Sequence, residues 1–238
     1  MKLTRLIAGL IALAVLCLSA NPAFAADEDG VAVAIVYDTS GSMKELVKDS
    51  AGKYAPKYQI ANRALVAIAN RIQSFATNHT TGTPRKIHTG LFVFQKSGAT
   101  AALPFGPFNA AALTKWARDF SMPEGGTPLG NALNTAGSAV LHSGLTRKHV
   151  LVITDGMNTV GPSPTLTLPT LQQQAGQQQT SVAVHFVAFD VDAKVFEGVK
   201  KLGATVVGAA NESQLNTQLG FILEKKILLE DEEPPTKK

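Results

Sequence analysis

Apolar positions along the chain follow two alternating patterns, which together predict an α/β fold. Short runs without polar interruption recur, and Val31–Tyr37 is the first of them. Such a run predicts a strand that is buried on both faces, as in a parallel sheet. The expected strands are 31–37, 87–94, 150–154, 182–189 and 204–207, with an edge strand of small residues at 99–103 that ends before Pro104.

Between these runs, apolar residues recur three or four positions apart, which predicts helices. In the stretch from Tyr58 to Ala76, for example, Ile60, Ala64, Ile68 and Ile72 share one helical face. Strands that alternate with helices predict a doubly wound, mostly parallel sheet with helices on both faces. The expected helices are 58–76, 109–120, 127–142, 169–179 with Pro169 in its first turn, 193–202 and 213–229.

The first 25 residues have the pattern of a signal peptide. Lys2 and Arg5 precede the apolar run Leu6–Leu18, which is shorter than the roughly 20 residues that a membrane span needs. Small residues at Ala23 and Ala25 favour cleavage after Ala25, and an uncleaved anchor is the alternative. We therefore expect a signal peptide at 1–25, one domain at 26–229 and a mobile charged tail at 230–238. The processed chain, without a membrane span, would lie in the periplasm or outside the cell.

Composition excludes several classes of protein. A chain with 45% hydrophobic and 17% charged residues is too apolar for disorder. Removal of residues 1–25 lowers the formal net charge from +4 to +2, so nucleic-acid binding is not indicated. Cys17 is the only cysteine and lies in the expected signal peptide, which rules out disulfides, cysteine-based zinc sites and cysteine nucleophiles in the processed chain.

Oxygen-bearing side chains gather where expected strands end. Asp38, Ser40 and Ser42 follow the first strand, Asp155 follows strand 150–154, and Thr127 stands after a glycine pair, before a helix. In an open α/β sheet, ligands bind at the carboxyl ends of strands. Hydroxyl and carboxylate oxygens suit Mg²⁺, Mn²⁺ or Ca²⁺ better than zinc or copper. We expect Gly41 to let the backbone curl, so that both serine hydroxyls point at one centre.

These three segments resemble the von Willebrand factor type A (vWA) domain and its metal-ion-dependent adhesion site (MIDAS). The matching pieces are Asp38–Ser42, Gly126–Gly130 and Ile153–Gly156, and the resemblance spans about residues 29–229. It implies a Rossmann-like sheet in which the first and fourth strands are neighbours. It also implies that Ser40 and Ser42 bind the metal directly, that Thr127 binds directly or through water, and that Asp38 and Asp155 act through water. A partner's Asp or Glu carboxylate would fill the remaining position.

Simpler structural roles exist for the same residues. Ser40 or Ser42 could cap a helix, Thr127 is expected to cap its helix, and Asp155 could hold a turn. The insertion Lys44–Lys57 could contact a partner or could be a solvated loop without function. Of the histidines, His88 and His185 are expected in strands and His79, His142 and His149 at the surface.

Three functions follow from this interpretation. The favoured one is an exported, non-enzymatic adhesion module that captures an acidic group of a protein through the cation. The second is a structural subunit of an envelope complex in which the metal only stabilises the fold. The third is a metal-dependent phosphatase with Asp38 as nucleophile, which is disfavoured because Ser40 stands where such chemistry needs a second carboxylate.

Overall fold

A computed structural model describes residues 27–77, 86–95 and 97–229. The expected signal peptide and charged tail lie outside these residues, as does His79. The described chain forms a six-stranded sheet in the order β5-β4-β1-β6-β7-β8, in which β5 alone runs antiparallel to its neighbour. Its strands are β1 (Glu28–Tyr37), β4 (Lys86–Gln95), β5 (Gly98–Pro107), β6 (Leu145–Thr154), β7 (Ala183–Phe189) and β8 (Thr205–Ala209).

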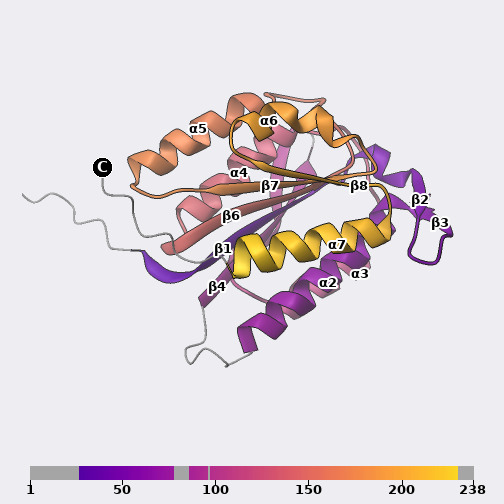
Figure 1. Ribbon diagram of the computed structural model, residues 1–238, viewed down its shortest axis with the longest axis horizontal. Helices are drawn as coiled ribbons and strands as arrows, with labels where there is room; N and C mark the ends of the chain where they lie inside the picture. Colours follow the sequence, from indigo (N-terminus) through magenta and orange to yellow (C-terminus); the bar gives the residue numbers. More distant parts are fainter. Residues whose placement is uncertain (1–26, 78–85, 96, 230–238) are drawn as a thin grey trace, which may run out of the picture.

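Helices cover both faces of the sheet, as predicted (Figure 1). One face packs against α2 (Lys57–Thr77), α3 (Ala110–Asp119) and α7 (Glu212–Ile222), and the other against α4 (Leu129–Leu141), α5 (Pro164–Gln177) and α6 (Glu197–Lys201). Strand β1 contributes to both cores, because its side chains alternate between the faces and all of Val31–Tyr37 is buried. The short 3-10 helices are η2 (Gly41–Lys44) and η4 (Ala193–Phe196), and a π-helical turn, η5 (Leu223–Leu228), extends α7.

The strand order reverses between β1 and β6, the first and fourth strands of the main sheet. From β1 the chain proceeds outward to β4 and β5, and from β6 it proceeds the other way to β7 and β8. The neighbour relation that the family resemblance implied is therefore confirmed. Because β1 and β6 are parallel, the residues that follow them emerge side by side at one end of the sheet.

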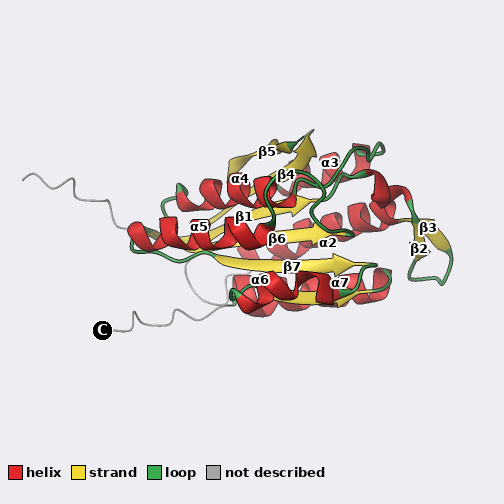
Figure 2. Cartoon of the chain, turned by 90° about the horizontal axis from the view of Figure 1, so that it is seen from above, coloured by secondary structure: helices red, strands yellow, loops and turns green. Residues whose placement is uncertain are grey.

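The insertion between the first strand and the first long helix is an ordered hairpin. Strands β2 (Leu46–Lys48) and β3 (Tyr54–Pro56) pair antiparallel, separate from the main sheet. Figure 2 shows this hairpin beyond the arrowheads of the main strands, at the end where β1 and β6 finish. In the part of the chain that the structure describes, no helix combines the length and apolarity required to cross a membrane.

Two predictions of element boundaries and one of surface exposure are wrong. Helix α5 begins at Pro164 rather than Pro169, so Pro164 occupies the first turn and Pro169 lies inside the helix on its exposed side, where water can reach the carbonyl that loses its donor. Strand β5 continues past Pro104 to Pro107, since an edge strand tolerates a missing donor on its outer side. His149 is buried rather than at the surface, because β6 begins at Leu145 and is flanked by β1 and β7.

Candidate metal centre

Asp38 is held rigidly at the end of β1. Its backbone N–H donates to the Ile153 carbonyl at 3.0 Å, which extends the β1–β6 pairing by one residue. Its side chain is buried, with Oδ1 accepting the Ser40 N–H at 2.8 Å and Oδ2 accepting the Thr154 hydroxyl at 2.6 Å. Both carboxylate oxygens are thus fixed between the two strand ends.

Two serine hydroxyls connect the end of β1 to the end of β6. Ser40 Oγ lies 3.0 Å from Ser42 Oγ, and Ser42 Oγ donates to Asp155 Oδ1 at 2.8 Å. Ser40 precedes η2 without a side-chain capping bond, so its hydroxyl is directed to Ser42 instead. Ser40, Ser42 and Asp155 therefore form one continuous chain of oxygen atoms.

The glycine turn before α4 is attached to this loop through the backbone. Gly41 N–H donates to the Gly125 carbonyl at 3.0 Å, and Glu124 N–H donates to the Thr39 carbonyl at 2.7 Å. Gly125, with φ +82°, adopts the left-handed conformation that favours glycine, whereas Gly41 does not. The expected special role of Gly41 is therefore wrong, and the glycine requirement lies at Gly125.

Thr127 faces the turn that follows β6. Its N–H donates to Thr159 Oγ1 at 2.8 Å, and its carbonyl accepts the Thr159 N–H at 3.0 Å. A Cβ built on Gly156 would lie 4.0 Å from Thr127 Oγ1, which places this hydroxyl beside the Asp155–Gly156 turn. The prediction that Thr127 caps α4 is wrong, because Pro128 occupies the N-cap position.

Lys57 is a buried cation next to these residues, and sequence analysis did not identify it. Its ammonium contacts Glu45 Oε2 at 2.7 Å, Asp155 Oδ2 at 3.1 Å and Asp190 Oδ2 at 3.2 Å, and only 4% of the side chain is exposed. The three carboxylates come from the hairpin, β6 and β7. No local pattern distinguishes Lys57 from the exposed lysines of the same insertion, so the sequence carried no signal for this contact.

Burial and charge shift the pKa values of this cluster. Burial, followed by the neighbouring Asp155 carboxylate, raises the pKa of Asp38 to about 6, although hydrogen bonds from Ser40 and Thr154 act in the opposite direction. Burial lowers the pKa of Lys57, but its hydrogen bond to Glu45 and the charge of Asp155 raise it by more, so the net shift is upward. The end of the sheet thus combines two buried carboxylates with one fixed ammonium.

The donor set fits a hard divalent cation. Three hydroxyls (Ser40, Ser42 and Thr127) and two carboxylates (Asp38 and Asp155) meet at one end of the sheet, and Mg²⁺ favours such oxygen ligands while retaining water. Among residues 27–77, 86–95 and 97–229, no group of three or more His, Cys, Asp or Glu side chains could hold a metal. A centre here would therefore depend on its hydroxyls.

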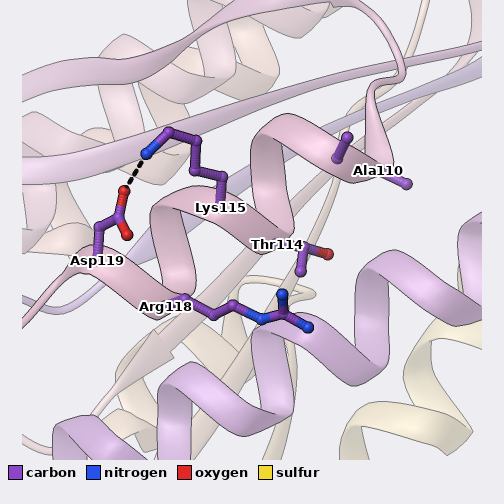
Figure 3. Close-up of a pocket in the computed structure, with 6 residues that line it drawn as sticks. Ala110, Thr114, Lys115, Arg118 and Asp119 are labelled. Atoms are coloured by element: carbon purple, nitrogen blue, oxygen red, sulfur yellow. Dashed lines mark hydrogen bonds and ion pairs between the residues drawn. The ribbon is translucent and has the colours of Figure 1, made fainter.

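A separate open hollow of about 540 Å³ lies on α3 and has a different character. Lys115 and Asp119 pair with each other along the helix, and Arg118 points away from that pair (Figure 3). All of its lining residues belong to this one helix. The hollow brings together no groups from different elements, so the candidate site remains the end of β1 and β6.

Comparisons with solved structures agree with this fold. The chain matches the PilB minor pilin from Streptococcus sanguinis at a TM-score of 0.59 and 15% identity, covering 83% of this chain and 62% of that one. It matches the vWF domain of the type V pili tip protein Mfa5 from Porphyromonas gingivalis at a TM-score of 0.56 and 13% identity, covering 83% of this chain and 95% of that one.

The chain also matches a structure of proximal thread matrix protein 1 from the mussel byssus with a zinc-occupied MIDAS motif. The TM-score is 0.58 and the identity 17%, covering 83% of this chain and 48% of that one. The chain thus spans about half to three fifths of the length of the pilin and the byssus protein. At these identities the likeness shows the fold alone. A search of curated protein sequences finds no match.

The family model for the von Willebrand factor type A domain matches residues 32–218, which is most of the chain. This match includes both strand ends and the Thr127 turn. Domains of this family are mostly non-catalytic binding modules, typically dependent on a MIDAS that binds a divalent cation. The chain belongs to the von Willebrand factor type A domain family.

Proposed function

We propose that this protein is a metal-dependent binding module that captures an Asp or Glu carboxylate of a protein partner. Ser40, Ser42 and Thr127 would hold the cation through hydroxyl oxygens, and Asp38 and Asp155 would balance its charge. Mg²⁺ is the favoured ion, with Mn²⁺ and Ca²⁺ as alternatives. The observation that carries this proposal is the chain of oxygens Ser40–Ser42–Asp155, which joins the ends of the two central strands.

The charges around the site support capture of an anion. Hydroxyl ligands are neutral, so they leave most of the charge on the ion. Asp155 Oδ2 is already paired with the Lys57 ammonium at 3.1 Å, which reduces the negative charge that Asp155 can contribute. When bound, the cation would supply an electron-poor position for an oxygen from another molecule.

The arrangement disfavours the phosphatase alternative. A nucleophilic carboxylate must reach its substrate, but Asp38 is completely buried and both of its oxygens accept hydrogen bonds. Lys57 contacts Asp155 and not Asp38. Asp38 is thus a fixed structural acceptor.

We further propose that the protein is exported through residues 1–25. Mass spectrometry of the native protein should then find a chain that begins at Ala26.

Calorimetric titration with Mg²⁺ tests the proposed function. Asp38→Ala should weaken Mg²⁺ binding by about 10–100-fold, the loss typical when an outer metal partner is removed. Asp119→Ala is the matched control, because it removes an exposed carboxylate on α3 whose one ion pair among the described residues is with Lys115. Equal Mg²⁺ affinities of the wild type and Asp38→Ala would contradict the proposal. Assembly with a partner that persists in chelator would instead favour the structural-subunit alternative.

A further inference from the structure

The β2–β3 hairpin presents one buried face and one exposed face beside the candidate site. Its cross-strand pairs are Leu46 with Pro56, Val47 with Ala55 and Lys48 with Tyr54, and paired side chains lie on the same face. Val47 is buried, whereas Leu46 and Tyr54 on the other face are 61% and 66% exposed. The outer face therefore displays an aliphatic group, an aromatic ring and the Lys48 ammonium.

The hairpin also has an excess of positive charge. Its two acidic side chains are already engaged, since Glu45 pairs with Lys57, and Asp49 Oδ1 accepts the N–H groups of Ala51 and Lys53. Three exposed lysines of the hairpin and its entry, by contrast, form no ion pair within the described part of the chain. They are Lys44, Lys48 and Lys53.

The backbone that carries these three lysines is held in place relative to the candidate site. Lys44 is two residues from Ser42, and Lys57 joins Glu45 at the base of the hairpin to Asp155. The tip is fixed as well, because Ser50 N–H donates to Glu212 Oε2 at 2.8 Å. A ligand whose carboxylate reached the candidate site would therefore have the three lysines beside it.

The chain itself contains a segment of complementary charge. Four consecutive acidic residues, Glu230–Glu233, follow directly after Leu229, and Pro234-Pro235 separate them from two lysines. Helix α7 begins after β8 and runs back toward the starts of the strands (Figure 1), so Leu229 lies at the opposite end of the sheet from the hairpin.

Distance excludes an intramolecular contact with the candidate site. Helix α7 and η5 separate Leu229 from Glu212, which bonds the hairpin at Ser50, by about 25 Å at roughly 1.5 Å per residue, whereas four residues extend at most about 14 Å. The acidic residues of one molecule therefore cannot reach back to its own metal site. They can reach the basic hairpin and candidate site of a second molecule.

We propose that the acidic segment Glu230–Glu233 of one copy binds the metal site and β2–β3 hairpin of a second copy. One carboxylate occupies the open position of the cation, and its neighbours contact Lys44, Lys48 and Lys53. This inference rests on the proposed function, because it names the partner of that site. A head-to-tail contact of this kind does not close on itself, so each addition leaves one free site and one free segment.

Sedimentation velocity of the processed chain in Mg²⁺ and in EDTA tests the inference. We expect species that grow with protein concentration in Mg²⁺ and a monomer in EDTA. The hairpin variant (Lys44→Gln, Lys48→Gln, Lys53→Gln) and the tail variant (Glu230→Gln, Asp231→Asn, Glu232→Gln, Glu233→Gln) should each be monomeric. A mixture of these two variants should stop at a one-to-one complex, because each retains one working half.

The matched control is a variant in which Lys200, Lys201 and Lys225, which lie at the other end of the sheet, are substituted. This control variant should still self-associate.

A labelled peptide of residues 229–238 gives a second readout. The peptide should bind the wild type in Mg²⁺, and it should bind the hairpin variant at least tenfold more weakly. Its binding to the wild type should also weaken at high salt. A monomeric wild type that does not bind the peptide, or self-association that persists in the tail variant, would overturn the inference. Stronger binding to phosphatidylserine vesicles than to the peptide would also overturn it. If Asp38→Ala still weakened Mg²⁺ binding in those cases, the proposed function would stand.

Discussion

Strands β6 and β7 carry buried polar groups at both ends, and the two ends satisfy them differently. Where the strands finish, Asp155 and Asp190 share the Lys57 ammonium, so opposite charges are paired. Nearer their starts, His149 and His185 lie side by side with ring nitrogens 3.4 Å apart. Burial, followed for His149 by the charge of His185, lowers their pKa values to about 3 and about 4.

This difference supports the proposal that a ligand binds at the end where the strands finish. Where the strands finish, the Asp155 and Asp190 carboxylates and the Lys57 ammonium are held in place, and an added cation would change their net charge. At the histidine end the two imidazoles stay neutral, because neutral imidazoles are cheaper to bury than charged ones and Arg147 and Lys226 also oppose their protonation. The same two strands thus carry paired charges where they finish and neutral imidazoles nearer their starts.

The largest loss of stability should come from removal of the Lys57 ammonium, where β6 and β7 finish. Lys57→Met would leave the fully buried Asp155 carboxylate without its ammonium, and we expect a loss of about 3–5 kcal/mol in the free energy of unfolding. Urea denaturation measures this loss, and added Mg²⁺ should recover part of it. Lys115→Met breaks an exposed pair and should cost about 0–1 kcal/mol. Equal losses in the two variants would refute the distinction between the paired end and an ordinary surface pair.

An intermediate effect should come from acid at the histidine end. The unfolded chain binds these protons near pH 6.5 and the folded chain only near pH 3–4, so stability falls as the pH drops below about 6.5. Each histidine should contribute about 2 kcal/mol of loss between pH 7 and 4.5. The double variant His149→Gln, His185→Gln should lose less stability over this range than the wild type, whereas exposed His142→Gln should behave like the wild type. Parallel pH profiles of the wild type and the double variant would be inconsistent with neutral burial.

The smallest effect should come from loosening of the hairpin at the charged end. Glu212 accepts hydrogen bonds from Arg63 and from Ser50 N–H, and Arg63 is half exposed. Glu212→Gln should cost about 1 kcal/mol and accelerate hydrogen exchange at the Ser50 amide several-fold. The Ala112 amide, bonded to Asn109 on α3, should exchange at its wild-type rate. An unchanged Ser50 rate would show that Glu212 does not fix the hairpin.

Sequence predicted those features that depend on local pattern. Uninterrupted apolar runs located the strands, and polar residues directly after two of them led to Asp38 and Asp155. Periodicity also located α2 and α4. These features could be predicted because strand burial and strand ends leave a signal within a few neighbouring residues.

Features that depend on contacts between distant elements could not be predicted. Lys57 meets carboxylates from the hairpin, β6 and β7, and nothing near it in the sequence marks this. His149 belongs to a polar stretch that resembles a surface segment, yet it is buried because β6 has strands on both sides. Pro169 appeared to start a helix because the turn supplied by Pro164 lacks a strong apolar pattern.

Anomalous scattering from crystals soaked in Mn²⁺ tests the proposed metal centre most directly. We predict one strong peak between the hydroxyls of Ser40, Ser42 and Thr127, and a weaker peak there in crystals of Asp38→Ala soaked at the same Mn²⁺ concentration. A wild-type crystal with no peak at that position, or with its manganese bound elsewhere, would contradict the proposal that this end of the sheet holds a cation.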